Sequence, residues 1–186
     1  MSEIYKTSPA KSCKISLSQS ERRTQEIVKF CTTLIAVRDM SKSLQFYHDL
    51  FGQEVAVDLG KNKSLACGLA LQEGFDELAG FPTKTMHFHS NTMELYFETE
   101  DFDGFLALLD KHPEVERLHG PKTFPWLQRG IRIFDPNGHL IEVSESMPSV
   151  AYRQFAQGKT VEEAARLIQH PLPLVQSWYE GYNRNI

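Results

Sequence analysis

The stretch Asp135-Pro-Asn-Gly-His-Leu-Ile-Glu-Val143 determines how the rest of this chain is interpreted. It predicts a tight turn and then a short strand, because proline presets φ, asparagine tolerates the left-handed region and glycine permits positive φ. Strand alternation places Ile141 and Val143 on one face and Glu142 on the other. A carboxylate on a largely apolar strand must be solvated, paired or bound to a metal, since burying it alone is costly. Glu142 is therefore a candidate site residue.

Length and composition bound the possible classes of protein. The chain has 186 residues, of which 41% are hydrophobic, and a net charge of −4. It fits one large domain or two small packed modules, and its charge does not predict a basic nucleic-acid surface. No run approaches the length of a transmembrane helix, and Met1 to Gln25 lacks the apolar segment of a signal peptide. We therefore expect a cytoplasmic protein without a membrane partner.

The three cysteines, Cys13, Cys31 and Cys67, are widely spaced and form no CxxC pair. An odd number without pairing motifs indicates reduced thiols, in line with the cytoplasmic prediction. Cys31 and Cys67 fall on predicted strands, where we expect them to be small buried hydrophobic residues.

The order of predicted elements occurs twice along the chain. The first set is a strand over 30–37, an amphipathic helix that Gly52 ends, and strands over 54–59 and 64–72, the latter with a hinge at Gly68. After a linker over 73–91 come a strand over 93–99, a helix capped by Asp101 or Asp103, and strands over 115–118, 130–134 and 139–144. Such an internal repeat predicts two similar modules.

Aligning the two halves pairs four positions. When Asp39 is matched with Asp101, Thr32 falls opposite Glu94, and at the far end Gln72 falls opposite Glu142. Strand alternation turns all four away from the apolar residues that should pack on the helices. We therefore expect the four side chains to converge on one cavity between the halves.

These features resemble the vicinal oxygen chelate superfamily, which includes glyoxalase I, bleomycin- and fosfomycin-resistance proteins and extradiol dioxygenases. The resemblance covers about residues 30–147. It depends on Leu34-x-x-Val37-x-Asp39 with Phe46-Tyr47, on Glu94-Leu-Tyr-Phe97, and above all on the stretch from Asp135 to Glu142. It implies an α+β fold in which two paired βαβββ modules form a cupped mixed sheet.

The resemblance also implies a metal site, because ligands in the superfamily come from the first and last strands of each module. In this chain the matching positions are Thr32, Gln72, Glu94 and Glu142. Glutamate and glutamine serve as ligands in the superfamily, whereas threonine is a poor ligand and none of the four is histidine. Such an oxygen set suits Mg²⁺ or Mn²⁺ better than Zn²⁺ or Fe²⁺, so the ions that we consider are Mg²⁺, Mn²⁺, Ni²⁺ and Zn²⁺. A bound ion implies Lewis-acid catalysis with a displaced glutamate, Glu94 or Glu142, as general base. Alternatively, the two glutamates are hydrogen-bonded or solvated in a polar pocket.

Two histidines near the linker offer a further candidate metal site. His87 and His89 share a face if their segment is a strand, and they could supply the missing imidazoles. The alternative is that both are solvated or hydrogen-bonded histidines of a loop. His139 has the opposite parity to Glu142 and is expected to be structural.

Aromatic and basic residues form a candidate substrate pocket. Tyr96 shares the strand face of Glu94, and Trp126 and Arg129 precede the strand over 130–134. Trp126 could stack on a planar ligand while Arg129 holds an anionic group. Alternatively, Trp126 closes one end of the cup and Arg129 pairs with a surface acid.

Beyond residue 147, breakers at Gly158 and Pro171 separate three predicted helices, over 151–157, 161–169 and 174–182. Their spacing resembles a helix-turn-helix with Gln169 at the turn, but the balanced charge does not favour DNA binding. A helical extension that packs on the cup or makes a dimer contact is the alternative.

The predicted organisation is a leader over 1–28, a glyoxalase-like domain over 29–147 with modules 29–78 and 92–147, and a helical extension over 148–186. The resemblance implies a glyoxalase-like protein that binds a small oxygen-rich molecule, and it leaves a divalent-metal-dependent lyase or isomerase open. A second function is non-catalytic sequestration by a homodimer, as in bleomycin resistance. A third is a regulator in which the cup senses a ligand and the C-terminal helices respond.

Overall fold

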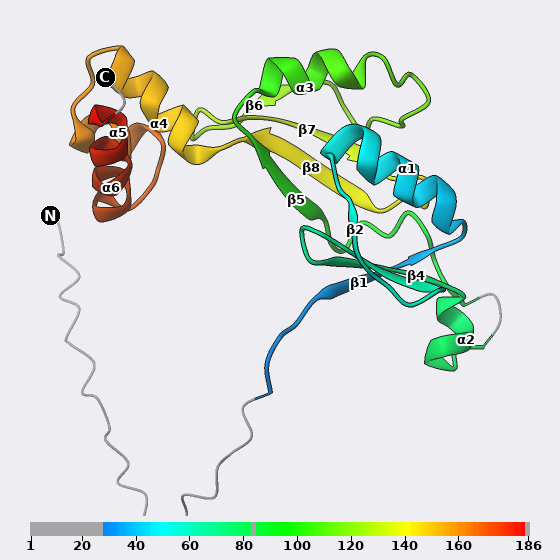
Figure 1. Cartoon of the computed structure of the whole chain (residues 1–186). Coiled ribbons are helices and arrows are strands. Elements are labelled where there is room, and N and C mark those ends of the chain that lie inside the picture. Colours follow the sequence, from blue (N-terminus) through cyan, green and yellow to red (C-terminus); the bar gives the residue numbers. More distant parts are fainter. Residues whose placement is uncertain (1–27, 83–84, 185–186) are drawn as a thin grey trace, which may run out of the picture. The chain divides into compact units, whose positions relative to one another are not determined.

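The computed structural model describes residues 28–82 and 85–184 (Figure 1). The chain divides into two compact units, Met1–Cys31 and Thr32–Ile186. All helices and strands described below belong to the second unit. The predicted leader over 1–28 and Cys13 lie outside the described residues, apart from Val28.

The first module contains one helix and four strands. Its elements are β1 (Thr33–Val37), α1 (Met40–Phe51), β2 (Val55–Asp58), β3 (Asn62–Leu65) and β4 (Leu69–Glu73). Helix α1 begins where the Asp39 side chain accepts a hydrogen bond from the Lys42 amide, and it ends at Gly52 in the left-handed conformation. The end at Gly52 follows the prediction, since glycine adopts positive φ without strain, and aspartate at the start satisfies a free amide.

The second module repeats this arrangement with β5 (Leu95–Thr99), α3 (Phe102–Leu109), β6 (Lys122–Thr123), β7 (Arg129–Phe134) and β8 (Leu140–Glu145). The two sheets have the strand orders β1-β4-β3-β2 and β5-β8-β7-β6, so equivalent strands occupy equivalent places. In both, the first strand runs parallel to the last. The prediction of an α+β fold with two βαβββ modules is therefore confirmed.

The strand pairing shifts one of the predicted equivalences by two residues. Thr33 faces Leu69 in the first module, and Leu95 faces Ile141 in the second. On this register the counterpart of Glu142 is Ala70, and Gln72 corresponds to Ser144. The difference arises because β4 starts directly after Gly68, whereas His139 separates Gly138 from β8.

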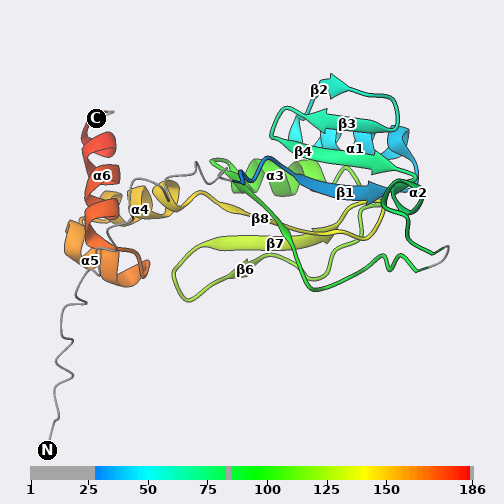
Figure 2. The same cartoon turned by 90° about the horizontal axis from the view of Figure 1, so that it is seen from below.

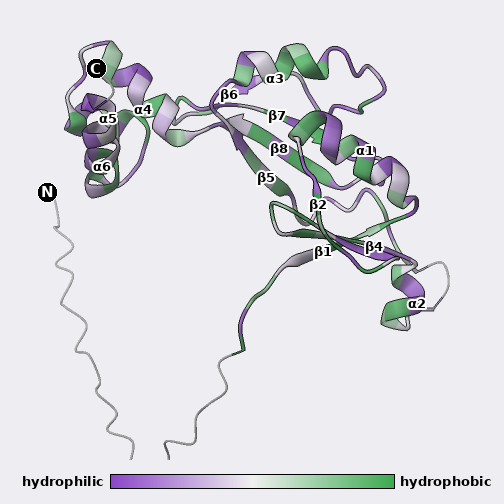
Figure 3. Ribbon diagram, in the orientation of Figure 1, coloured by the Kyte–Doolittle hydropathy of each residue, from purple (hydrophilic) through white to green (hydrophobic). Residues whose placement is uncertain are grey.

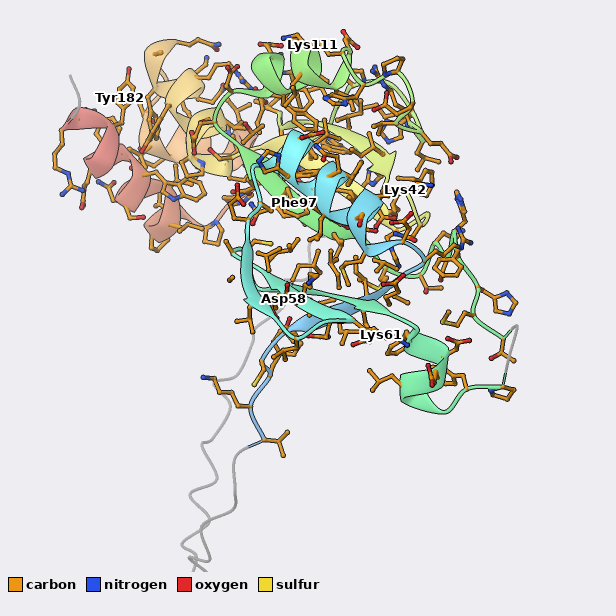
Figure 4. All side chains as sticks on the ribbon, turned by 45° about the vertical axis from the view of Figure 1, so that its right-hand side comes forward. Lys42, Asp58, Lys61, Phe97, Lys111 and Tyr182 are labelled. Carbon is orange, nitrogen blue, oxygen red and sulfur yellow. The ribbon has the colours of Figure 1, made fainter. Side chains whose placement is uncertain are left out.

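Both sheets contribute to a single hydrophobic core. It includes Ile35 and Leu71 from the first module and Ile141 and Val143 from the second, packed with residues of α1 and α3. The ring of Phe51 on α1 lies 4.5 Å from that of Phe97 on β5, which Figure 4 shows beside α1. Figure 2 shows the strands of the two modules in two groups, and Figure 3 shows hydrophobic and hydrophilic residues alternating around α1. The two sheets therefore turn their other faces away from this core.

Several local predictions are wrong. The predicted strand over 115–118 is a loop with one isolated bridge, between Arg117 and Ile133. The linker, predicted without a helix, contains a short one, α2 (Phe75–Ala79), whereas the predicted hinge at Gly68 lies between β3 and β4. Cys31 and Cys67 are exposed rather than buried, because both lie in connections at strand ends and not within β1 or β4.

The C-terminal helices are α4 (Met147–Ala156), α5 (Val161–Leu167) and α6 (Leu172–Asn183). They enclose a hydrophobic cluster of their own, against which Trp126 and Leu127 of the second module also pack. Gln169, between α5 and α6, has a φ of 57°, as expected for the residue at such a turn. Within the described part of the chain, no helix has the length and apolar character needed to cross a membrane.

Candidate functional site

The two glutamates that the resemblance singled out lie on the face of the second sheet that points away from the helices. Glu142 is in β8 and only 4% exposed, with one carboxylate oxygen accepting a hydrogen bond from the Ser144 hydroxyl at 2.8 Å. Glu94 directly precedes β5 and is more accessible. The buried carboxylate of Glu142 needs a compensating charge, because an isolated buried charge is strongly unfavourable.

Arg132 supplies that charge. It lies directly opposite Glu142 in the β7–β8 ladder, and its Nη2 forms an ion pair with Glu142 Oε2. Its Nε donates to Glu94 Oε2 at 2.8 Å, so one guanidinium bridges both carboxylates. The hydrogen bond with Glu94 raises the pKa of Arg132, and the charges of Glu142 and Glu94 act in the same direction, against partial burial. The group therefore remains a cation at all physiological pH values.

The sequence interpretation missed Arg132, although a signal for it exists. In a hairpin centred on Asn137, residues five positions before and five after the centre face one another. Counting outward from the Asp135-Pro-Asn-Gly turn therefore pairs Arg132 with Glu142 from the sequence alone.

In the described part of the chain, Thr32 and Gln72 form no hydrogen bond with Glu94, Arg132 or Glu142. The Thr32 hydroxyl donates to the carbonyl oxygen of Gly68, while the Gln72 side chain accepts from Asn62 at 2.9 Å and donates to the carbonyl oxygen of Glu73. These hydrogen bonds stay within the first module, and those of Glu94 and Glu142 stay within the second. The structure thus brings together two of the four predicted ligands.

The residue set does not fit the superfamily's metal ion. A divalent cation between Glu94 and Glu142 would have to displace the Arg132 guanidinium or lie beside its positive charge. Thr32 and Ala70 offer little to complete a coordination sphere from the first module. In residues 28–82 and 85–184, no three His, Cys, Asp or Glu side chains are grouped to hold a metal.

An aromatic edge borders the two glutamates. The rings of Phe124 and Trp126 stack with centroids 4.9 Å apart, and the Arg132 guanidinium lies 5.6 Å from the Phe124 ring. The Trp126 indole donates to the Gln128 side chain at 2.7 Å, which in turn donates to the Tyr96 hydroxyl at 2.8 Å. Trp126 and Tyr96 are therefore linked through Gln128.

Tyr96 is half-exposed on this face and donates to Glu98 at 2.9 Å. Partial burial, with help from Glu98 and Glu142 and against the hydrogen bond from Gln128, raises the pKa of Tyr96 to about 12. The hydroxyl is thus protonated at neutral pH. We refer to the surface formed by these side chains as the polar face, and its members are Glu94, Tyr96, Glu98, Phe124, Trp126, Gln128, Arg132 and Glu142.

Arg129 is engaged by the protein. Its guanidinium forms two hydrogen bonds with Asp103, at 2.9 and 3.1 Å, and one with Glu145 at 2.9 Å. The carboxylates of Asp103 and Glu145 raise its pKa. Glu145 also pairs with Arg153 of α4, which donates to the Leu127 carbonyl oxygen as well. Arg129 therefore belongs to a network that joins β8, α3 and the C-terminal helices, and an anion-binding role for it stays a prediction.

The His87–His89 segment is a loop, as in the second of the two alternatives, so the two histidines do not lie on a strand. His89 has a φ of 59°, and its ring lies 5.1 Å from that of Phe134. A Cβ on Gly138 would fall 2.7 Å from His89 Nε2, so the turn needs glycine there for space as well as for its φ of 84°. His139 bonds to the Asp135 carboxylate at 2.8 Å, in the structural position that its parity indicated.

A cavity of about 450 Å³ lies elsewhere, between α1 and the loop after α3. Phe46, Leu50 and Val115 line it, together with a mixed polar rim, and no member of the polar face contributes to it. The cavity and the polar face are therefore separate features.

Comparison with known proteins identifies the class. The family model of the glyoxalase-like domain matches residues 30–148, nearly two thirds of the chain. The chain therefore belongs to the glyoxalase-like family, within the vicinal oxygen chelate superfamily. The match ends before α4, so the C-terminal helices lie outside it.

Several solved structures resemble about two thirds of the chain. A protein of unknown function from Agrobacterium tumefaciens str. C58 is 32% identical, with a TM-score of 0.56 over 64% of this chain and 95% of that one. A hypothetical protein from S. aureus is 18% identical, with a TM-score of 0.54 over 65% and 96%. A lactoylglutathione lyase from Agrobacterium tumefaciens is 21% identical, with a TM-score of 0.48 over 66% and 96%. No curated protein matches the chain.

Proposed function

We propose that this protein binds a small planar molecule on the polar face without a metal ion, as a sequestering or carrier protein. The observation that carries the proposal is the stacked Phe124–Trp126 pair beside the Arg132 bridge. Aromatic side chains offer a stacking surface, and the nearby amide and hydroxyl groups offer hydrogen bonds.

The charges of the polar face limit the chemistry of the ligand. Arg132 neutralises one of the two carboxylates, Glu94 or Glu142, which leaves one net negative charge before Glu98 is added. An anionic ligand is therefore disfavoured. In the described part of the chain, Nη1 of Arg132 has no hydrogen-bond partner, so it can donate to a carbonyl or hydroxyl oxygen of the ligand. A neutral or cationic aromatic compound with acceptor oxygens fits this face.

We further propose that the protein is a homodimer of the cytoplasm. The helix-facing sides of both sheets enter one core, so the polar face points outward, where a second copy can cover it. The exposed apolar side chains of β2, Val55 and Val57, offer further area for such a contact. Light scattering of the protein as it elutes from a size-exclusion column tests this proposal. A monomeric mass at all protein concentrations would contradict the dimer.

The two other functions have weaker support. A metal-dependent lyase or isomerase would require Arg132 to release Glu94 and Glu142. A DNA-binding regulator would require basic residues on α6, whose sequence LPLVQSWYEGYN contains none. The sequestering function needs neither change.

The two tryptophans allow a direct test. Both pack against the C-terminal cluster, but Trp178 is not part of the polar face, so Trp178→Phe leaves Trp126, on that face, as the only tryptophan. We expect neutral aromatic carbonyl compounds, screened as a panel, to quench the fluorescence of Trp178→Phe saturably and equally with and without EDTA. Trp126→Phe, which keeps Trp178, serves as the matched control and should show no saturable quenching by the same compounds. Binding that disappears in EDTA, or quenching only by carboxylates, would contradict the proposal.

A further inference from the structure

We infer that the Arg132 guanidinium is a built-in replacement for a divalent cation, and that its removal leaves the carboxylates of Glu94 and Glu142 able to bind such an ion. The inference concerns the cation that the polar face holds, so it does not depend on which ligand the face binds. It begins from the buried carboxylate of Glu142.

Glu142 is the least replaceable part of the arrangement. Its Oε2 is shielded from solvent, and Arg132 Nη2 is the cation against it in the described part of the chain. The other oxygen accepts one hydrogen bond, from Ser144. A carboxylate in this position is stable only with a positive charge beside it. The Arg132 guanidinium, between Glu142 and Glu94, supplies that charge.

The first module lacks the arginine and both of the carboxylates at the equivalent positions. In the β3–β4 ladder Ser64 faces Ala70, where in the β7–β8 ladder Arg132 faces Glu142. Thr32, just before β1, takes the place that Glu94 has just before β5. The three positions that hold Glu94, Arg132 and Glu142 in the second module thus hold uncharged residues in the first. Neither the two acids nor the arginine are therefore needed to build the sheet.

Arginine and a divalent ion exclude one another here. Arg132 reaches both carboxylates from the neighbouring strand through Nε and Nη2. An ion at the same two oxygens would lie within a few ångströms of the guanidinium, in a partly buried place where charges are poorly screened. Removing the guanidinium should leave two acidic oxygens from β8 and the start of β5, which is a donor set for a hard divalent ion.

The test uses the full-length protein and Mn²⁺ as the probe, detected by electron paramagnetic resonance and by thermal unfolding. Wild type should leave Mn²⁺ free and unfold at the same temperature with and without it. Arg132→Met, which keeps the stem of the side chain, should bind one Mn²⁺ at least about tenfold more tightly than wild type. Its unfolding temperature should rise with Mn²⁺, because a ligand of the folded state stabilises it.

Two further variants act as controls. Arg132→Lys keeps a positive charge on β7 and should bind Mn²⁺ no better than wild type. Arg132→Met/Glu142→Gln lacks the buried acid and should lose the gain. If Arg132→Met is too unstable to purify, Arg132→Gln refolded in Mn²⁺ replaces it, because the ion should restore the missing charge.

Three results would overturn the inference. One is stoichiometric Mn²⁺ on wild type that Glu142→Gln removes, since the ion would then displace the arginine. Another is a folded Arg132→Met protein that Mn²⁺ neither binds nor stabilises. The last is failure of both Arg132→Met and Arg132→Gln to fold in Mn²⁺. None of these depends on the fluorescence titration, so the inference and the proposed function can fail separately.

Discussion

The two modules share one topology and differ in the chemistry of one sheet face. At three equivalent places the first module has Thr32, Ser64 and Ala70, and the second has Glu94, Arg132 and Glu142. Strand order, parallel pairing and the aspartate caps are the same in both. The fold therefore tolerates either set, and we attribute the charged set to function.

The modules also differ in how they are tied to the rest of the chain. The turn between β7 and β8 is anchored to α1 through Asp135, whereas the turn between β3 and β4 holds the exposed Cys67. The end of β8 is tied to α4 through Glu145, whereas Glu73 at the end of β4 forms no ion pair with any described residue. Each contrast predicts that a substitution in the second module costs more than its counterpart in the first.

The substitution expected to lower the free energy of unfolding most is that of Asp135. One carboxylate oxygen accepts from the Asn137 and His139 amides, and the other bonds to the Tyr47 hydroxyl and the His139 ring. Asp135→Ala leaves these buried groups without partners and should lower the free energy of unfolding by about 4 kcal/mol, measured by urea denaturation. The counterpart Cys67→Ala should change it by less than about 0.5 kcal/mol. Equal losses would remove the contrast between the turns.

The pH dependence of the Asp135 contribution has a definite sign. Burial alone would raise the pKa of Asp135, but the hydrogen bonds and charge of His139, together with the Asn137 amide, hold it below its ordinary value. A carboxyl with a lowered folded-state pKa stabilises the fold above the unfolded-state pKa, near 3.9. The stabilisation is lost as the pH falls through the folded value. Asp135→Ala should therefore show a smaller loss of stability in acid than wild type.

Much of the fold follows from local sequence signals. Asp39, Gly52 and Asp101 mark helix ends through capping, and the repeat predicts the order of strands. The register of β4 could not be predicted, because it depends on how many residues separate the turn glycine from the first paired residue. The loop over 115–118 was predicted as a strand because Val115 and Leu118 are apolar, yet Val115 is buried without a partner strand.

The site was less predictable than the fold. Glu94 and Glu142 are visible in the motifs, but their partner Arg132 becomes visible only through pairing across the hairpin. Arg129 and Arg132 are residues of the same type in the same strand, so the sequence does not distinguish them. Only the tertiary contacts with Asp103 and Glu145 show that Arg129 is paired with acids of the protein itself. Residue type therefore identified the acids, and geometry was needed to distinguish the two arginines.

An intermediate effect is expected at Glu145, where β8 leads into the C-terminal helices. Burial would raise its pKa, but the hydrogen bonds from Arg153 and Arg129 lower it from 4.5 to about 2. Its stabilisation is present above pH 4.5 and is lost as the pH falls toward 2. Glu145→Gln should cost about 3 kcal/mol at pH 7 and much less at pH 2, as calorimetry can show.

The counterpart of Glu145 in the first module is Glu73, since Val37 faces Glu73 as Thr99 faces Glu145. Glu73→Gln should change the stability by less than about 0.5 kcal/mol at either pH. A cost at Glu73 as large as that at Glu145 would mean that the C-terminal helices do not account for the difference between the modules.

The smallest effects concern the two helix caps, where the modules are most alike. Asp39 accepts from the Lys42 amide at 3.1 Å, and Asp101 accepts from the Gly104 amide at 2.8 Å. Asp39→Ala and Asp101→Ala should each cost about 1 kcal/mol in chemical denaturation. A difference between them of more than about 1 kcal/mol would show that the caps are not equivalent.

Gly104 makes that comparison sharper, because α1 has the larger Lys42 at the same place. A Cβ on Gly104 would fall 2.6 Å from Cγ of Asp101, so Gly104→Ala must displace the capping side chain. The lost cap costs about 1 kcal/mol, and the better helix propensity of alanine returns about the same. In wild type the substitution should be nearly neutral, whereas in an Asp101→Ala background it should stabilise by about 1 kcal/mol. The same stabilisation in both backgrounds would mean that the cap tolerates a Cβ at this position, as it does in α1.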